Sequence, residues 1–412
     1  AVSMEDPQVA AEALMQRYVA AWRDFRPSEA FGYGDVDAAA RFESFSNDRV
    51  EGWLAQNRET VRSMQSLLKA NGIRPSLRTD IQVQLAQAED ELAAWDEDAP
   101  LSRQPQWFAE LVSQALTHLL VRDQLSAQQR SDAAVARLAG VAELCRSAVE
   151  SLTGGNRLRW ERALSTLGCA LEFYAGVLVE LVADLPAASD GRAVSGAVGP
   201  AIEAIEALEA HLRDEILPIA SDEVSIGAQA YAAKLARRTG GLYDPQGLLL
   251  AATDEVSSVR ELMIAEAERW RNSLGEAAPD ASEEALLALA IEAMEADRQD
   301  NAADFLASFT DLTFAAERFV EENGIATVPK PTTLIVALSP AHFSGAAVGG
   351  VYPSGPFDPS ADTLFYVPSI PDTAPAAARE GFYRSFNTHF NTMIMSHEMF
   401  PGHYLQYKVA VS

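Results

Sequence analysis

The sequence predicts a mainly α-helical protein with a small β region near its C-terminal end. Three observations lead to this prediction. From residue 8 to about residue 325, apolar residues recur every three or four positions among Ala, Leu, Glu and Arg, which is the period of amphipathic helices. Two short apolar runs with β-branched residues follow at 332–338 and 363–367, as expected of strands. The helical period then returns at Ala376.

The helical part is interrupted at turn-rich sites such as 154–156, 190–191 and 240–241, where Gly, Asn and Asp gather. No fixed-period repeat is apparent, which argues against a solenoid. Between these sites we expect helices over 9–24, 47–70, 81–95, 105–120, 127–151, 157–185, 199–215, 225–239, 245–274 and 282–322.

The β region is expected over about 332–367. Its middle, 345–362, is rich in Gly, Pro, Ser and Asp and predicts a loop or a hairpin. From Ala376 we expect one long helix that carries the segment 396–406. The predicted organisation is therefore a helical body over 1–325, with 326–412 packed on it as one catalytic unit.

Charge and cysteine content exclude several classes of protein. The 412 residues include 59 acidic and 32 basic side chains, for a formal charge of −27, which disfavours a nucleic-acid partner. The only cysteines, Cys145 and Cys169, are too few for a disulfide framework and fit no zinc knuckle. We interpret them as small buried apolar residues.

Membrane insertion is not expected either. The most apolar long segment, 164–185, contains Glu172, Glu180 and Asp184, which are costly in lipid, so it predicts a core helix. The first residues have no basic stretch followed by an apolar run, so no signal peptide is expected. A cytoplasmic location is therefore predicted, whereas the oligomeric state is not indicated.

The chemically informative segment is His397-Glu398, followed by Pro401-Gly402 and His403. Histidines six positions apart point roughly 120° apart on a regular helix and do not reach one metal. Pro401 removes the N–H that would bond the His397 carbonyl, and Gly402 tolerates unusual backbone angles. We therefore expect a kink or bulge at Pro401-Gly402 that returns His403 toward His397.

A histidine followed directly by a glutamate, with a second histidine close behind, is how zinc hydrolases assemble two ligands and a base. His397 and His403 are accordingly the expected ligands of one zinc ion. Glu398 is the expected general base, which takes a proton as water attacks a carbonyl and passes it to the leaving amine. The alternative interpretation is a polar patch on a helix without metal.

Three further side chains are candidates near this segment. Tyr366 and Tyr352 are the predicted substrate-binding residues, and Tyr366 is preferred because it lies on a strand that faces the substrate in this interpretation. Packing is the alternative for both. His389, two turns before His397, is a candidate to hydrogen-bond a ligand, and an ordinary surface or core histidine is the alternative.

The wider sequence resembles a known bacterial family. The resemblance rests on 397–406 (His-Glu-Met-Phe-Pro-Gly-His-Tyr-Leu-Gln), on 351–358 with 365–367, and on 27–35 with 45–48. The segment 397–406 resembles that of the proteins grouped as domain of unknown function 885 (DUF885), and Tyr404 stands where the family often has another histidine. The resemblance implies helical zinc metallopeptidases, similar in fold to the thermostable carboxypeptidase Taq group.

The resemblance also implies a third, carboxylate ligand, downstream of the segment. Residues 405–412 still have a mid-helix pattern with no stop signal, so we expect the chain to be truncated at its C-terminal end. We thus predict a zinc metallopeptidase acting on short or partly unfolded peptides. The alternatives are a metal hydrolase of other amides or esters, and a catalytically inactive helical scaffold that binds peptides or proteins.

Overall fold

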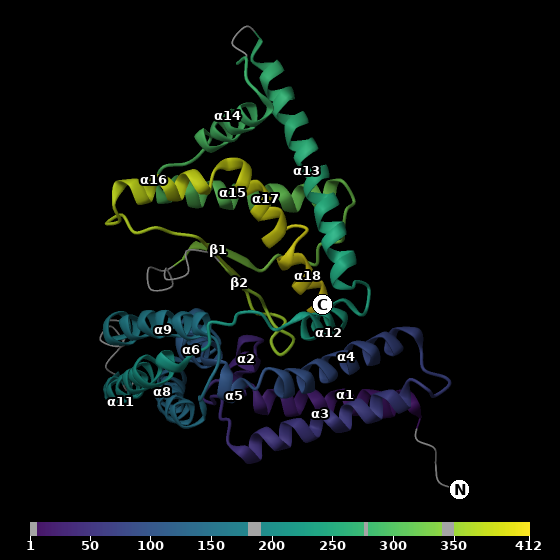
Figure 1. Ribbon diagram of the computed structural model, residues 1–412, viewed down its shortest axis with the longest axis vertical. Helices are drawn as coiled ribbons and strands as arrows, with labels where there is room; N and C mark the ends of the chain where they lie inside the picture. Colours follow the sequence, from purple (N-terminus) through teal and green to yellow (C-terminus); the bar gives the residue numbers. More distant parts are fainter. Residues whose placement is uncertain (1–5, 180–190, 276–278, 340–349) are drawn as a thin grey trace. The chain divides into compact units, whose positions relative to one another are not determined.

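The computed structural model describes residues 6–179, 191–275, 279–339 and 350–412 and shows a mainly α-helical protein with a small sheet (Figure 1). The predicted fold class is thereby confirmed. The chain divides into two compact units, Ala1–Ile226 and Gly227–Ser412, and each has a hydrophobic core of its own. Within the described residues, no helix is both long and apolar enough to cross a bilayer.

The first unit consists of packed helices. Neighbouring pairs along its core are α1 with α3, α3 with α4, α6 with α9, and α8 with α11. The bounds of these long helices are α1 (Pro7–Phe25), α3 (Asn47–Leu67), α4 (Pro75–Glu97), α6 (Pro105–Gln114), α8 (Ala127–Ser151), α9 (Arg157–Glu172) and α11 (Gly191–His211). Short helical turns connect them: α2 (Pro27–Gly32), η1 (Val36–Ala38), α5 (Pro100–Arg103), α7 (Thr117–Val121), η2 (Phe173–Val177), η3 (Leu212–Ile216) and η4 (Leu217–Ile219).

Capping side chains explain where several of these helices begin. The carboxylate of Asp6 accepts a hydrogen bond of 3.0 Å from the backbone N–H of Gln8 at the start of α1. Ser126 and Gln129 form a reciprocal capping box at the start of α8. This local signal marks the start of α8, and the predicted range 127–151 agrees with the observed helix at both ends.

The second unit combines helices with the sheet. Its elements are α12 (Ala228–Thr239), α13 (Pro245–Ser273), α14 (Glu283–Ala296), α15 (Ala302–Glu322), β1 (Leu334–Leu338), β2 (Gly350–Tyr352), β3 (Thr363–Val367), α16 (Ala376–Ser385), α17 (Thr388–Glu398) and α18 (His403–Val411). The domain boundary expected near residue 325 falls inside this unit, because α15 packs against β1 and α17.

The sheet has the order β1-β3-β2, with β1 parallel and β2 antiparallel to the central strand β3. Along β3 the side chains alternate, so that Thr363, Phe365 and Val367 are buried whereas Leu364 and Tyr366 are half-buried. β2 lies within the stretch expected to be a loop or hairpin, of which residues 345–349 are outside the described residues.

The buried face of the sheet and the helices around it form the core of the second unit. Phe365 from β3 packs in this cluster with Phe309 from α15, Met395 from α17 and Phe400 after α17. The ring centroids of Phe309 and Phe365 are 6.2 Å apart. The helices that carry the chemical motif are therefore fixed by apolar packing against α15 and β3.

Three of the expected helices are interrupted. The range 105–120 contains α6 and α7, with a turn between them. The range 282–322 contains two helices, because Asn301 starts α15 by accepting a hydrogen bond from the backbone N–H of Asp304. The long helix expected from Ala376 is wrong for a similar reason. Asn387 accepts a hydrogen bond from the backbone N–H of Phe390 and begins α17 as a separate helix after α16.

Candidate metal centre

A second interruption separates the two histidines of the motif. α17 ends at Glu398, and α18 begins at His403. The backbone N–H of Leu405 donates to the carbonyl oxygen of Met399 at 3.2 Å, so the chain between them is folded back on itself. Pro401 lies in this turn and has no N–H to continue the helical bonding of α17. The predicted break at Pro401-Gly402 is confirmed.

Apolar anchors hold this turn in place. Met399 and Phe400 are buried in the core of the second unit, and so are Tyr404 and Leu405 just after the turn. The rings of Phe400 and Tyr404 lie 5.1 Å apart between centroids. The turn therefore has buried side chains on both of its sides, which keeps the relative position of α17 and α18 fixed.

Gly402 is required by a close approach of two backbone segments. A Cβ atom at this position would lie 2.6 Å from the carbonyl oxygen of Ser396, and closer still to the carbonyl group of His397. Its φ of −76° is one that other residues adopt, whereas its ψ of −140° lies outside the common α and β ranges. The expected unusual backbone angle is thus present at Gly402, and the lack of space for any side chain is a second requirement for glycine.

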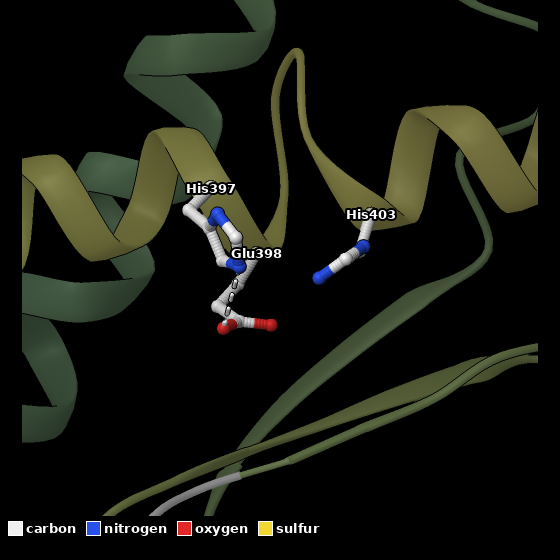
Figure 2. A group of neighbouring side chains, drawn as sticks. All are labelled: His397, Glu398 and His403. Carbon is white, nitrogen blue, oxygen red and sulfur yellow. Dashed lines mark ion pairs between the residues drawn. The ribbon is translucent and has the colours of Figure 1, made fainter. Parts of the chain in front are cut away.

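The turn brings His397, Glu398 and His403 together. One potential ligand atom from each of the three lies within 4.8 Å of the others. The two imidazole rings are 4.6 Å apart between centroids and nearly perpendicular, with an interplanar angle of 79°. Figure 2 shows that His397 and Glu398 project from the end of α17 and His403 from the start of α18 into a common space.

The exposure of the group suits it to bind a ligand from solvent. The side chain of His397 is 63% exposed and that of Glu398 is 24% exposed. The Nε2 atom of His397 is 3.8 Å from Oε1 of Glu398, which leaves both atoms available to a third partner. Two imidazoles that share a ligand position are donors of the kind that zinc prefers, and the carboxylate beside them is placed as a base would be, so the residues present fit this metal.

A polar network holds α18 from its inner side. The buried Lys408 donates from Nζ to Oγ1 of Thr333 at 2.6 Å, just before β1. Glu317 on α15 accepts hydrogen bonds from Lys330, at 2.8 Å, and from the hydroxyl of Thr332. The segment before β1 thus links α18 to α15, and the start of α18 carries His403.

Sequence reasoning missed Tyr407 and Lys408 as neighbours of the motif. The rings of Tyr407 and His403 are 6.1 Å apart between centroids. Tyr407 lies four positions after His403, so helical spacing alone predicts this contact once α18 is known to begin there. Lys408 carries no such signal, because its partner Thr333 is distant in the sequence.

The two predicted substrate-binding tyrosines form a pair with each other. The ring centroids of Tyr352 and Tyr366 are 5.6 Å apart, and burial, followed by the neighbouring Tyr366, raises the pKa of Tyr352. Strand alternation places Tyr366 on the sheet face opposite Phe365, which packs in the core with Met395. Their role in substrate binding stays a prediction.

His389 lies away from the other two histidines. Its Nε2 atom is 3.6 Å from Oδ2 of Asp297, which follows the end of α14. The side chain is half-exposed on α17. Of the two interpretations open for His389, this contact favours an ordinary surface histidine.

Comparison with known proteins gives the family. The profile of the family described as "Bacterial protein of unknown function (DUF885)" matches residues 27–412. The chain belongs to the DUF885 family. No curated protein sequence matches it. The fold resembles that of a solved structure from Shewanella oneidensis, described as "a putative lipoprotein of unknown function", with a TM-score of 0.65 and 16% sequence identity.

That likeness covers 96% of this chain and 71% of the Shewanella chain, and it shows a shared fold. Neither description names an activity or a metal. The family match begins at residue 27, where α2 begins. Two polar side chains near this point, Ser28 and Asp35, make contacts within the first unit. The backbone N–H and hydroxyl of Ser28 both donate to the buried carboxylate of Glu43, and Asp35 pairs with Arg23 at 2.7 Å. Ser28 and Asp35 of the DUF885 sequence pattern therefore make contacts that hold the chain around α2.

Proposed function

We propose that this DUF885 protein is a zinc-dependent hydrolase, and specifically a metallopeptidase. The observation that carries the proposal is the convergence of His397, Glu398 and His403 from both sides of the turn between α17 and α18. Histidines six positions apart gain a common ligand position only because of this turn. The close backbone approach at Gly402 supports the proposal, because it fixes the turn that brings the two histidines together.

In this proposal His397 and His403 hold one zinc ion, and a further carboxylate ligand comes from outside the group of three. A zinc ion in such a site polarises a carbonyl and lowers the pKa of a water molecule. The exposed imidazole of His397 leaves the site open to substrate. The buried contacts of Met399 and Tyr404 keep the two imidazoles in place before any ligand binds.

Glu398 acts as the general base in this proposal. Its carboxylate takes a proton from the attacking water and returns it to the nitrogen of the leaving amine. Glu398 is the last residue of α17, and its side chain is on the same side of the turn as both imidazoles in Figure 2. Its partial exposure leaves the carboxylate accessible to water.

A peptide is the proposed substrate because the site belongs to the same unit as a short sheet with two outer strands. In the described sheet β1 and β2 are the outer strands, and an extended peptide binds such an edge through main-chain hydrogen bonds. Tyr352 lies on the outer strand β2, next to Tyr366 of β3. We also propose that the fold of this chain is related to that of the carboxypeptidase Taq group.

The proposal is tested by zinc content and peptide hydrolysis in the same set of variants. We expect the purified protein to bind one zinc ion per chain, and His403→Ala to lose it. Glu398→Gln is expected to keep the zinc and to lose about 10²- to 10⁴-fold in turnover of short peptides. His389→Ala is the matched control, because His389 is on the same helix and faces Asp297.

Two alternative functions give different results in this experiment. Zinc binding with hydrolysis only of non-peptide amides or esters indicates a metal hydrolase of another substrate class. Peptide binding without stoichiometric zinc, and without an effect of Glu398→Gln, indicates an inactive scaffold. Unchanged zinc content in His403→Ala contradicts the assignment of His403 as a ligand.

A further inference from the structure

A cavity of about 340 Å³ lies in the first unit, on chain segments remote in sequence from the histidine group. Its volume is in the range of sites for small organic ligands. The indoles of Trp95 on α4 and Trp107 on α6 line it together with two guanidinium groups, those of Arg26 and Arg159. An apolar wall with a few placed charges is the usual composition of a small-molecule site.

The wall of this cavity is held rigidly around Glu91. Its Oε1 atom accepts hydrogen bonds from Nε1 of Trp53 at 2.7 Å, from Nε1 of Trp95 at 3.0 Å and from Nη2 of Arg26 at 3.0 Å. The guanidinium carbon of Arg26 also lies 5.7 Å from the centroid of Trp107. These contacts fix both indoles and one guanidinium group in advance of ligand binding.

Arg159 differs from Arg26 because it has no acidic partner. In the first turn of α9, its Nη1 donates to the neutral amide of Gln104. No carboxylate among the described residues is within ion-pair distance of its guanidinium group. In a protein with a net charge of −27, an arginine that lines a cavity and forms no ion pair among the described residues is a candidate to bind an anion.

The charges around the cavity limit the class of anion. Glu91 and Asp98 line it together with the two arginines, so its formal charges balance. Arg26 pairs with Glu91, so a ligand with one negative charge can pair with Arg159, whereas a phosphate dianion or a nucleotide brings further negative charge toward two carboxylates. The guanidinium groups also disfavour a metal cation. The indole walls require an apolar body of about the size of one aromatic ring.

We propose that this cavity binds a small aromatic carboxylate, whose carboxylate group pairs with Arg159 while its ring lies against Trp95 and Trp107. The site is independent of the proposed zinc chemistry, since none of its residues belongs to the histidine group. It adds a binding function to the helical first unit of the chain.

The test measures binding of phenylacetate to the purified full chain by isothermal titration calorimetry. Saturable binding is expected. Phenylacetamide, acetate and inorganic phosphate are each expected to bind at least about tenfold more weakly. Phenylacetamide has no negative charge, acetate has no ring, and phosphate has no ring and more than one negative charge. Arg159→Met is expected to weaken phenylacetate binding by about tenfold or more and to abolish the preference over phenylacetamide. Arg159 makes one side-chain hydrogen bond, so this variant is expected to fold, as checked by circular dichroism.

Arg162→Met is the matched control, because Arg162 is exposed on the same helix and does not line the cavity. It is expected to bind phenylacetate as the unchanged protein does. The proposal is overturned by absence of saturable phenylacetate binding up to ~10 mM, or by equal binding in Arg159→Met. An equal loss in Arg162→Met also overturns it, because that result indicates non-specific attraction to positive charge. Preferential binding of phosphate identifies an adventitious anion and overturns the aromatic class.

Discussion

Replacement of Gly402 by alanine is the sharpest test of the turn that joins α17 and α18. The added Cβ atom would lie 2.6 Å from the carbonyl oxygen of Ser396, whereas ordinary contacts start at 3.4 Å. It would lie even closer to the carbonyl group of His397. Both opposing groups are backbone, so no side-chain rotation relieves the clash, and the turn itself has to move.

The displacement required by Gly402→Ala is at least 0.8 Å, the shortfall at the Ser396 carbonyl. Overpacking in a well-packed region costs about 1–3 kcal/mol, and we expect the upper end because Met399 and Tyr404 hold both sides of the turn. The same displacement separates His397 from His403. Zinc affinity is therefore expected to fall by about 10- to 100-fold, as for other changes that misplace a ligand.

Urea denaturation of the metal-free protein measures the loss of stability in Gly402→Ala, and competition with a chromogenic chelator measures zinc affinity. Gly381→Ala is the control, because Gly381 is exposed on α16 and a Cβ there has nothing within 4 Å. That control is expected to gain about 0.5–1 kcal/mol from helix propensity. Unfolding free energy and zinc affinity unchanged in Gly402→Ala would refute the close approach and the reasoning built on it.

Two further predictions concern buried polar contacts. Burial raises the pKa of Glu91, but the charge of Arg26 and three hydrogen bonds more than offset this and leave the pKa below its ordinary value. Its stabilising effect is therefore present above the unfolded-state pKa and is lost as the pH falls through the lower folded-state pKa. Glu91→Gln is expected to reduce the free energy of unfolding by about 2 kcal/mol at neutral pH. Urea denaturation over a pH series is expected to show this difference shrinking on acidification, and a difference constant with pH contradicts it. Lys408→Met and Thr333→Val are each expected to weaken the attachment of α18, and their effects on unfolding free energy are expected to be non-additive by about 1 kcal/mol or more. Additive effects in that double-mutant cycle would show that the 2.6 Å contact contributes nothing.

Much of the fold follows from local signals in the sequence. The start of α8 is predictable because its capping box is contained in four residues, and β3 is predictable because a short β-branched run ends at Pro368. The starts of α15 and α17 are not, because Asn301 and Asn387 interrupt an apolar period that continues across them. Asparagine also occurs inside helices, so the pattern alone does not identify it as a cap.

Some features of the candidate site were likewise predictable from the sequence, and others were not. Helical geometry and the Pro401-Gly402 pair predict that the two histidines need a break to meet, and the structure contains that break. The close approach that excludes a side chain at Gly402 was not predictable, since it depends on where the carbonyl of Ser396 lies after folding. The link between Lys408 and Thr333 was not predictable either, because it joins residues 75 positions apart.

The turn before His403 makes the spacing of the two histidines independent of the direction that the chain takes after the second one. When both histidines are on one helix, the direction of the chain after the second histidine is fixed by the axis on which the first one lies. Here the direction of α18 is set separately, by the burial of Tyr404 and by the bond from Lys408. The orientation of α18 can therefore diverge between relatives by repacking its inner face, while His397 and His403 keep their spacing.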